Sequence, residues 1–240
     1  YLDQNFSLEQ IAKGTRVPIS TATLYSYAHQ GKIRYRAKKY RLKKKPFHSQ
    51  VPDPEFFAKH SIQLRSKKIE TRQEFGHWEV DGVESPLGYK PLLITFVERK
   101  TRFYVAFKAK NKGINGIEGA MENFLHFYGQ YVKSMTFDRG TEFTNISNVL
   151  LLKKRGIKVY YADAYQPGQR GSNEERNKQI RKYFPKGTKF GEILQVMINN
   201  ATHQINQKPL GVLNWHTPQD KFNLERQRII RKEEKRQKTD

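Results

Sequence analysis

Three acidic side chains in this chain are placed where they could hold divalent metal ions. Asp81 and Asp138 each end a predicted strand, at 77–81 and 132–138, and Glu174 lies near the start of a predicted helix. Carboxylates at strand ends can converge at one edge of a sheet, where a helix can supply a third ligand; Mg²⁺ prefers such oxygen ligands. Two ions about 3.5–4 Å apart activate a water or hydroxyl and stabilise a leaving oxygen, which is what phosphodiester cleavage requires.

Each of these residues also has an ordinary structural explanation. Asp138 followed by Arg and Gly is typical of a turn after a strand. A Glu near a helix start usually makes only a favourable interaction with the helix dipole, and Glu175 is placed almost as well as Glu174. Glu79 and His77 point to the same face of their strand as the first aspartate. For Glu79 we expect a structural salt bridge, and for His77 a packed or hydrogen-bonded ring.

The charge of the chain indicates a polyanionic partner. Lys and Arg number 45 against 23 Asp and Glu, which gives a net charge of +22 and a pI near 10.0. Such an excess favours nucleic acid, because counterions released from the phosphates make each contact favourable. An anionic membrane surface is the alternative, but no amphipathic helix with a clean apolar stripe accompanies the charge.

Cysteine usage and the chain ends suggest a compartment. Cysteine is absent, which excludes disulfides and thiolate metal sites and fits a reducing interior. The sequence has no apolar run of membrane-spanning length and no secretory leader. Because it begins at Tyr1 rather than Met, we expect a fragment of a longer protein located in the cytoplasm.

The first 31 residues predict a small helical module. Ser7 with Gln10 three residues later is a capping-box pattern that opens one helix, and Ser20 precedes a second helix over 21–28, closed by Gly31. Helix, short turn and helix is the shape of a helix-turn-helix, whose second helix can enter the major groove. A short helical hairpin without DNA contact is the alternative.

A strongly basic segment follows. Residues 32–45 include nine basic residues, with Tyr35 and Tyr40 interleaved. A run this dense cannot bury itself and is expected to be extended. We interpret it as an arm that tracks phosphates rather than as a solvated linker, and we extend the arm and linker to residue 75 because the next segment is polar and contains three prolines. The predicted DNA contacts in the arm are Arg34, Arg36, Lys38, Lys39, Arg41, Lys43, Lys44 and Lys45.

Residues 76–222 predict a catalytic domain of α/β class. Three strands near 77–81, 91–97 and 102–108 are expected to be antiparallel, since only short links join the second and third. Strands and helices then alternate to the end of the domain. This order is that of a ribonuclease H-like mixed sheet flanked by helices, here preceded by the helix-turn-helix. Residues 223–240 are expected to form a basic tail.

Three blocks of sequence resemble the catalytic blocks of DDE transposases. They are His77–Asp81, Thr136–Phe143 and Tyr165–Glu174, and more narrowly they resemble the insertion-sequence-thirty family within the retroviral integrase superfamily. Residues 93–102 and 177–187 match that family as well. The resemblance covers about residues 60–222, in the order and near the spacing of the family.

The resemblance implies catalytic and metal-ligating roles for Asp81, Asp138 and Glu174. It further implies two Mg²⁺ ions, for which Mn²⁺ would substitute, and an activated water that frees a 3′-hydroxyl at an element end; that hydroxyl then attacks target DNA. Lys178 and Arg181 follow Glu174 by four and seven residues, on one helix face, and are expected to contact the phosphate backbone.

The implied partners are double-stranded DNA, as terminal inverted repeats and as target, and a second copy of the chain in a dimer or higher oligomer. No membrane is expected, and the location would be the bacterial nucleoid. Two other functions stay open. One is a nuclease or integrase of the same fold, and the other is a transposase-derived protein that binds DNA without cutting it.

Overall fold

A mixed five-stranded sheet forms the centre of the protein. The computed structural model describes residues 1–35, 54–140, 143–144, 146–163, 166 and 171–237. The sheet order is β3-β2-β1-β4-β5, in which β1, β2 and β3 are antiparallel and β4 and β5 run parallel to β1. This is the expected mixed sheet. Its strands are β1 (His77–Glu84), β2 (Leu92–Glu98), β3 (Tyr104–Ala109), β4 (Ser134–Phe137) and β5 (Lys158–Tyr161).

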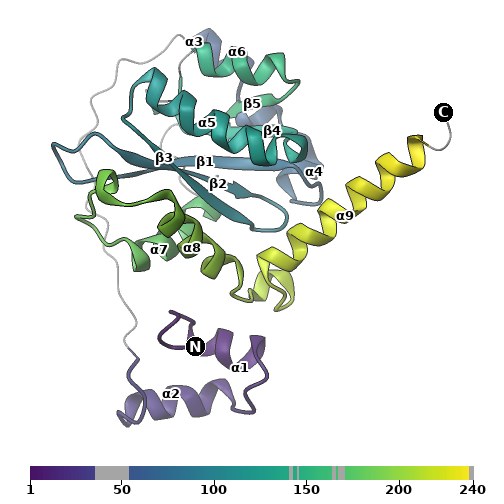
Figure 1. Cartoon of the computed structure of the whole chain (residues 1–240). Coiled ribbons are helices and arrows are strands. Elements are labelled where there is room, and N and C mark those ends of the chain that lie inside the picture. Colours follow the sequence, from purple (N-terminus) through teal and green to yellow (C-terminus); the bar gives the residue numbers. More distant parts are fainter. Residues whose placement is uncertain (36–53, 141–142, 145, 164–165, 167–170, 238–240) are drawn as a thin grey trace.

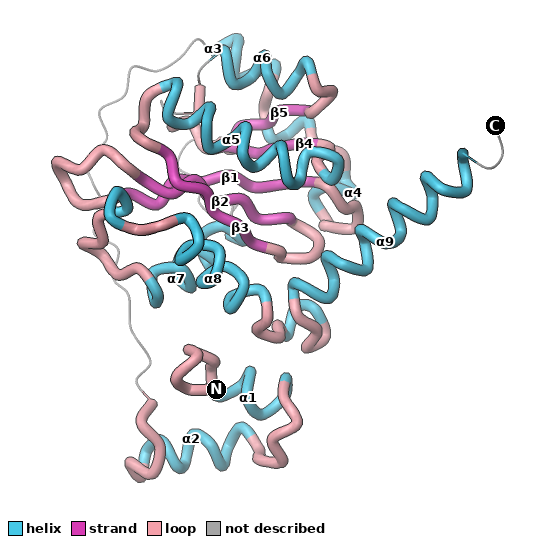
Figure 2. Tube along the Cα trace, in the orientation of Figure 1, coloured by secondary structure: helices cyan, strands magenta, loops and turns pink. Residues whose placement is uncertain are grey.

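Helices cover both faces of the sheet, as Figures 1 and 2 show. The helices α5 (Ile114–Tyr128) and α6 (Ile146–Lys154) lie on one face, and α7 (Gly171–Tyr183) and α8 (Gln195–Asn206) lie on the other. Since successive side chains of a strand alternate between faces, the sheet supplies two separate apolar cores, one under α5 and α6 and one under α7 and α8. The α7 face carries Glu79, Thr95, Ser134 and Thr136, which are buried polar residues of the sheet.

The last helix is anchored in the core by one aromatic ring. Helix α9 (Pro218–Gln237) occupies most of the segment expected to be a basic tail. Phe222 is 1% exposed and stacks on Phe103 with ring centroids 4.1 Å apart, and beyond it the helix runs out into solvent (Figure 1). Its composition of Lys, Arg, Glu and Gln favours helix without any apolar periodicity, which is why the hydrophobic pattern failed to predict it.

Residues 54–75, expected to belong to the linker, pack against the sheet instead. They form α3 (Pro54–Lys59), a 3₁₀ turn η1 (Ile62–Leu64) and α4 (Lys67–Glu70). Phe57 is 4% exposed within the main core, and the backbone N–H of Tyr161 donates to His60 O at 2.7 Å, which extends the sheet edge at β5. The folded domain therefore begins well before the expected boundary at residue 76.

The two N-terminal helices form as predicted. They are α1 (Leu8–Gly14) and α2 (Thr21–His29), and they pack on each other around Leu8, Ile11 and Leu24. The capping box is confirmed, because the Gln10 N–H donates to Ser7 Oγ at 3.2 Å and the Ser7 N–H donates to Gln10 Oε1 at 2.9 Å.

The N-terminal helices contact the segment that follows α8. Gln10 Nε2 donates to Pro209 O at 3.1 Å, and Lys208 Nζ donates to Asn5 O and to Tyr183 Oη, both at 3.1 Å. Gly14 is required at this contact, since a Cβ there would lie 2.0 Å from Pro209 Cγ. Burial, with the nearby charges of Lys182 and Arg176 as smaller causes, lowers the pKa of Lys208 to about 8.

Lys208 should make stability depend on pH. Between about pH 8 and the ordinary lysine value of 10.5, the unfolded chain binds more protons at this residue than the folded chain, so the free energy of unfolding rises with pH. We expect Lys208→Met to remove up to about 2 kcal/mol of this rise between about pH 8 and 9.5, measured by urea unfolding. Lys235→Met on the exposed end of α9 is the control. Equal pH slopes for the two variants would contradict the prediction.

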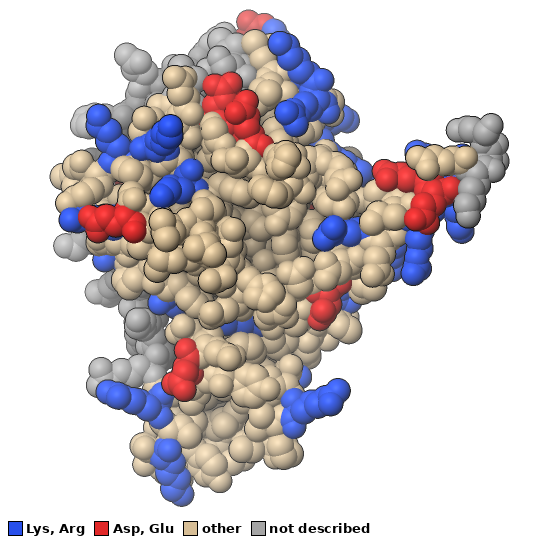
Figure 3. Space-filling model, in the orientation of Figure 1, with Lys and Arg blue, Asp and Glu red and all other residues tan. Residues whose placement is uncertain are grey.

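On the face drawn in Figure 3, the basic side chains of the described residues are spread over several elements. They lie on the N-terminal helices, on the helices at the top and along α9. Among the described residues, the helices are all too short or too polar to cross a bilayer.

Candidate active site

Strands β1 and β4 bring Asp81 and Asp138 to the same level of the sheet. The two strands are parallel neighbours in which Glu79 pairs with Thr136, so the same offset, continued by two residues, sets Asp81 opposite Asp138. Side chains two residues apart on a strand share a face. Both aspartates therefore lie on the α7 face of two strands that are about 4.8 Å apart. Asp81 lies within β1, which continues to Glu84, and not at the strand end that the sequence predicted; Asp138 follows the last residue of β4.

The carboxylate of Asp81 is oriented by hydrogen bonds. Its Oδ1 accepts from the Gly82 N–H at 2.9 Å, and its Oδ2 accepts from Asn177 Nδ2 on α7 at 2.8 Å. Asn177 Oδ1 in turn accepts from the hydroxyl of Tyr104 at 3.1 Å. Burial, and secondarily the charge of Asp81, raises the pKa of Tyr104 above its usual range, so this hydroxyl stays a donor. The chain of bonds fixes which way one oxygen of Asp81 points.

Asp138 begins a turn. Its Oδ1 accepts from the Gly140 N–H at 3.0 Å, which is the local arrangement expected of Asp before Gly. Arg139 turns away from the aspartate: its Nε donates to Ala162 O at 3.1 Å, and its guanidinium lies 4.7 Å from the ring centroid of Phe57. The guanidinium of Arg139 therefore interacts with residues beside β5.

Helix α7 presents Glu174 and Glu175 differently. The positions that face the sheet include Asn173 and Ile180, both 0% exposed. At about 100° per residue, Glu174 borders this buried side next to Asn177, whereas Glu175 lies opposite. Glu175 accepts from Gln179 Nε2 at 3.1 Å and lies 3.8 Å from Lys178, both on the outer side. The helix geometry therefore favours Glu174 over Glu175 as the residue nearer to Asp81.

The three predicted carboxylates occupy one region without closing around a common point. Among the residues that the structure describes, no three His, Cys, Asp or Glu side chains are close enough to hold a metal ion. Asp81 and Asp138 nevertheless offer two oxygen-rich side chains on one face, and Glu174 is exposed on the helix above them. This donor set suits hard divalent cations, which accept carboxylate oxygens and keep water or phosphate as further ligands.

A buried ion pair holds α7 above this region. Glu79 is 0% exposed; its Oε1 accepts from Arg99 Nη1, and its Oε2 accepts from the backbone N–H of Asn173 at 3.3 Å. Arg99 also donates to the carbonyl oxygens of Ile69 and Glu70 at 3.3 and 3.2 Å. The expectation of a structural salt bridge for Glu79 is confirmed, and this pair fastens the start of α7, one residue before Glu174.

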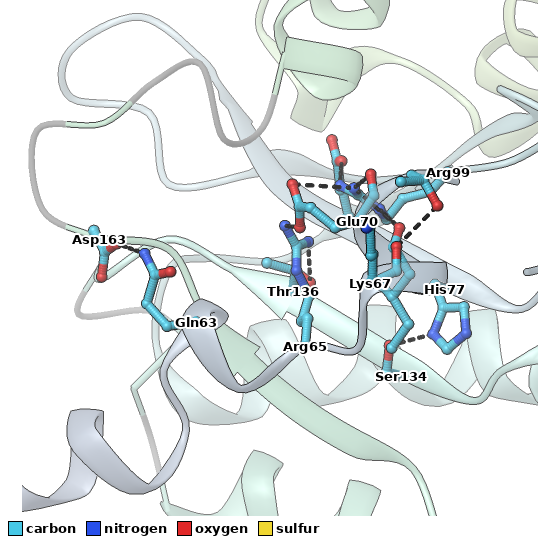
Figure 4. Close-up of polar contacts among 12 residues, drawn as sticks. Gln63, Arg65, Lys67, Glu70, His77, Arg99, Ser134, Thr136 and Asp163 are labelled. Atoms are coloured by element: carbon cyan, nitrogen blue, oxygen red, sulfur yellow. Dashed lines mark hydrogen bonds and ion pairs between the residues drawn. The ribbon is translucent and has the colours of Figure 1, made fainter. Parts of the chain in front are cut away.

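Further arginines surround this pair, as Figure 4 shows in part. Arg65 donates to Glu70 Oε2 and, at 3.4 Å, to Thr136 Oγ1, beside the strand that leads to Asp138. Burial lowers the pKa of Arg102 and of Arg176 to about 10. An arginine remains protonated at neutral pH even after such a shift, so Arg102 and Arg176 both stay charged.

His77 is a packed histidine, as expected. It is 4% exposed and its Nδ1 lies 2.7 Å from Ser134 Oγ, while burial lowers its pKa. It joins β1 to β4 and does not approach the aspartates.

The predicted DNA contacts have different environments. Lys178 is half exposed, while Arg181 is held against the protein, where its Nη2 donates to Glu84 O at 2.7 Å. In the arm, Arg34 is exposed. The other predicted arm contacts lie outside the described residues: Arg36, Lys38, Lys39, Arg41, Lys43, Lys44 and Lys45.

Sequence reasoning missed Asn177, Tyr104 and Arg99 as residues that shape the site. Asn177 follows Glu174 by three residues and so shares its helix face, which is a signal that could have been used. Tyr104 and Arg99 gave no such signal, because their roles depend on packing between strands and α7.

Comparison with protein families gives a match to the integrase core domain over residues 71–167. This segment contains β1 to β5 and both aspartates. Among solved structures, the catalytic core domain of BIV integrase superposes with a TM-score of 0.53 at 18% identity, covering 65% of this chain and 99% of that core. The likeness shows that the fold is that of an integrase core.

Curated relatives are similar over a larger part of the chain. The probable transposase for insertion-like sequence element IS1161 of Streptococcus salivarius is 33% identical over 213 residues, which are 85% of this chain and 59% of that protein. Transposase InsI for insertion sequence element IS30C of Escherichia coli is 33% identical over 160 residues, which are 66% of this chain and 41% of that protein. The chain thus spans about half the length of these relatives.

Proposed function

Since the chain belongs to the insertion-sequence-thirty family of DDE transposases, we propose that it cuts DNA at the ends of a mobile element and joins those ends to target DNA. The observation that carries the proposal is the common level of Asp81 and Asp138 on neighbouring parallel strands, beneath a helix that bears Glu174. Carboxylates arranged in this way are suited to binding metal ions next to a phosphodiester.

Asp81, Asp138 and Glu174 are the proposed metal ligands. An integrase core domain implies a divalent metal, and we propose two Mg²⁺ ions, which Mn²⁺ would replace; when bound they would activate a nucleophile and stabilise the leaving oxygen. Asn177 holds one oxygen of Asp81 in place, so that the carboxylate is oriented before a metal binds. Glu79 keeps the start of α7 over the sheet, and we propose that this contact orients Glu174 for metal binding.

The charged parts of the chain are the proposed DNA-binding elements. We assign the N-terminal helices and the arm over residues 32–45 to recognition of terminal inverted repeats, and Lys178 and Arg181 to phosphates beside the cut. The net charge of +22 supports this assignment, since phosphate contacts by Lys and Arg supply most non-specific affinity. We further propose that two copies of the chain act together on DNA, at the bacterial nucleoid.

Transfer of a strand into unrelated DNA distinguishes a transposase from its rivals. We expect the chain, with Mg²⁺, to join a pre-cut element end bearing a 3′-hydroxyl to a plasmid, giving products detectable on a denaturing gel. Omission of the metal should abolish the products, because the proposed carboxylates have no other means of activating the hydroxyl. DNA cleavage without joining would indicate a nuclease of the same fold. Specific binding with neither reaction would indicate a silent DNA-binding protein.

A further inference from the structure

The turn between β1 and β2 carries the most exposed of the large apolar side chains that the structure describes. Leu87 is 101% exposed and Tyr89 is 47% exposed. The turn projects beyond the flanking helices at the left of Figure 1. Gly88, with a φ of +90°, allows the chain to reverse here, and the Tyr89 N–H donates to Pro86 O at 3.1 Å. Leu87 therefore stands at the tip of a tight turn.

The base of this turn is fixed from two sides. Arg181 Nη2 of α7 donates to Glu84 O at 2.7 Å, and the Phe190 N–H donates to Ser85 Oγ at 3.1 Å. The Ser85 hydroxyl donates to Pro91 O, which closes the turn on itself. Lys189 Nζ lies 4.6 Å from the ring centroid of Tyr89. Single exposed apolar residues are common on protein surfaces, but the hydrogen bonds at the base of this turn hold Leu87 in its exposed position.

Basic side chains surround the tip. Lys90 and Lys186 are exposed beside it, and Lys112 lies 2.5 Å from Glu84 at its base. A surface hollow of about 470 Å³ separates the turn from the residues that follow α7, and Lys112, Arg181 and Lys186 are among its lining residues. An apolar tip between cations is complementary to duplex DNA. The cations can contact the phosphates that border a groove, and the apolar side chain can contact the bases at the bottom of that groove.

The tip lies within a limited distance of the proposed metal ligand Asp81. Leu87 follows Asp81 by six residues along the same strand and turn, which at about 3.3 Å per residue is at most about 20 Å. The rise of DNA is about 3.4 Å per base pair, so the tip lies no more than about six base pairs from a phosphate at Asp81. A duplex lying along β1 with its end at Asp81 would reach the tip.

We propose that the β1–β2 turn is a DNA wedge. Leu87 inserts from the minor groove at a base step no more than about six base pairs from the reacting phosphate, and Lys90, Lys186 and Lys189 contact the phosphates on either side. The proposal depends on DNA being the substrate, as set out under the proposed function. It adds a second contact on the substrate, away from the metal ligands, that would distort the duplex.

Unstacking of a fluorescent base tests the wedge. The probe is a blunt duplex of about three helical turns with 2-aminopurine placed at successive positions from a 3′-hydroxyl end, bound by the full chain. We expect fluorescence to rise at one position within about the first six with the parent and to stay low at all of them with Leu87→Ala. Affinity should fall about tenfold in Leu87→Ala and recover in Leu87→Met. Leu194→Ala is the control, because Leu194 is also exposed, at 64%, and lies outside the turn.

The outcomes separate the wedge from the DNA substrate itself. If the parent binds no duplex at all, the proposed function fails and the wedge fails with it. If the parent binds and cuts DNA while Leu87→Ala matches it in affinity and fluorescence, only the wedge is overturned. If Leu87→Ala loses self-association in sedimentation but keeps the fluorescence change, the turn is a protein contact and the wedge is again overturned.

Discussion

Asp81→Asn is expected to reduce Mg²⁺-dependent cleavage and strand transfer by about three orders of magnitude or more. Metal ions supply several kcal/mol of stabilisation to the reacting phosphate, and each 1.36 kcal/mol corresponds to about tenfold in rate. Asn has the same shape as Asp, and its amide oxygen can still accept the hydrogen bond from Asn177. The variant should therefore lose the charge that binds metal without losing the fold. Gel assays with labelled element ends provide the measurement.

Two controls restrict the interpretation of this variant. Specific DNA binding, measured by fluorescence anisotropy without metal, should equal that of the parent, since we assign DNA recognition to other parts of the chain. Glu122→Gln removes a carboxylate from the exposed side of α5 and should cleave as the parent does. Cleavage by Asp81→Asn at the parental rate would show that the metal assignment is wrong.

The strands could be predicted because their patterns are local. The apolar run expected to form a strand at 91–97 placed β2 within one residue of its observed bounds. Asp138 could be predicted for the same reason, since it directly follows the apolar strand β4, whereas Asp81 lies within β1, which continues three residues beyond the strand end expected at residue 81. Helix α9 could not be predicted, because its exposed surface needs no apolar stripe and its buried aromatic residue, Phe222, resembles any isolated aromatic residue.

The contacts that orient the site could not be predicted because they join distant parts of the chain. Glu79 reaches Arg99 across 20 residues and Asn173 across 94, and Asp81 reaches Asn177 across 96. No periodicity links such pairs, since each depends on how α7 lies across the sheet. Sequence reasoning therefore identified the proposed ligands and missed the residues that hold them.

Arg99→Met is expected to lower the free energy of unfolding by about 3–5 kcal/mol. The substitution leaves Glu79 as a carboxylate that is 0% exposed without its cation, and an uncompensated buried charge has about this cost. Urea unfolding followed by circular dichroism gives the value. The matched control is Lys59→Met, which breaks an ion pair with Glu55 whose side chains are 69% and 70% exposed; there we expect a change of about 0.5 kcal/mol or less.

The double variant Glu79→Leu with Arg99→Met separates stability from positioning. Replacing both charges of a buried pair by apolar side chains of similar size is often nearly neutral, so most of the lost stability should return. Cleavage by the double variant should stay well below that of the parent. The Asn173 N–H loses the acceptor that holds the start of α7 over β1, and Glu174 is the next residue along this helix. If the double variant cleaves as the parent does, the pair serves folding alone and the position of α7 is set by Asn177 and the apolar contacts of Ile180.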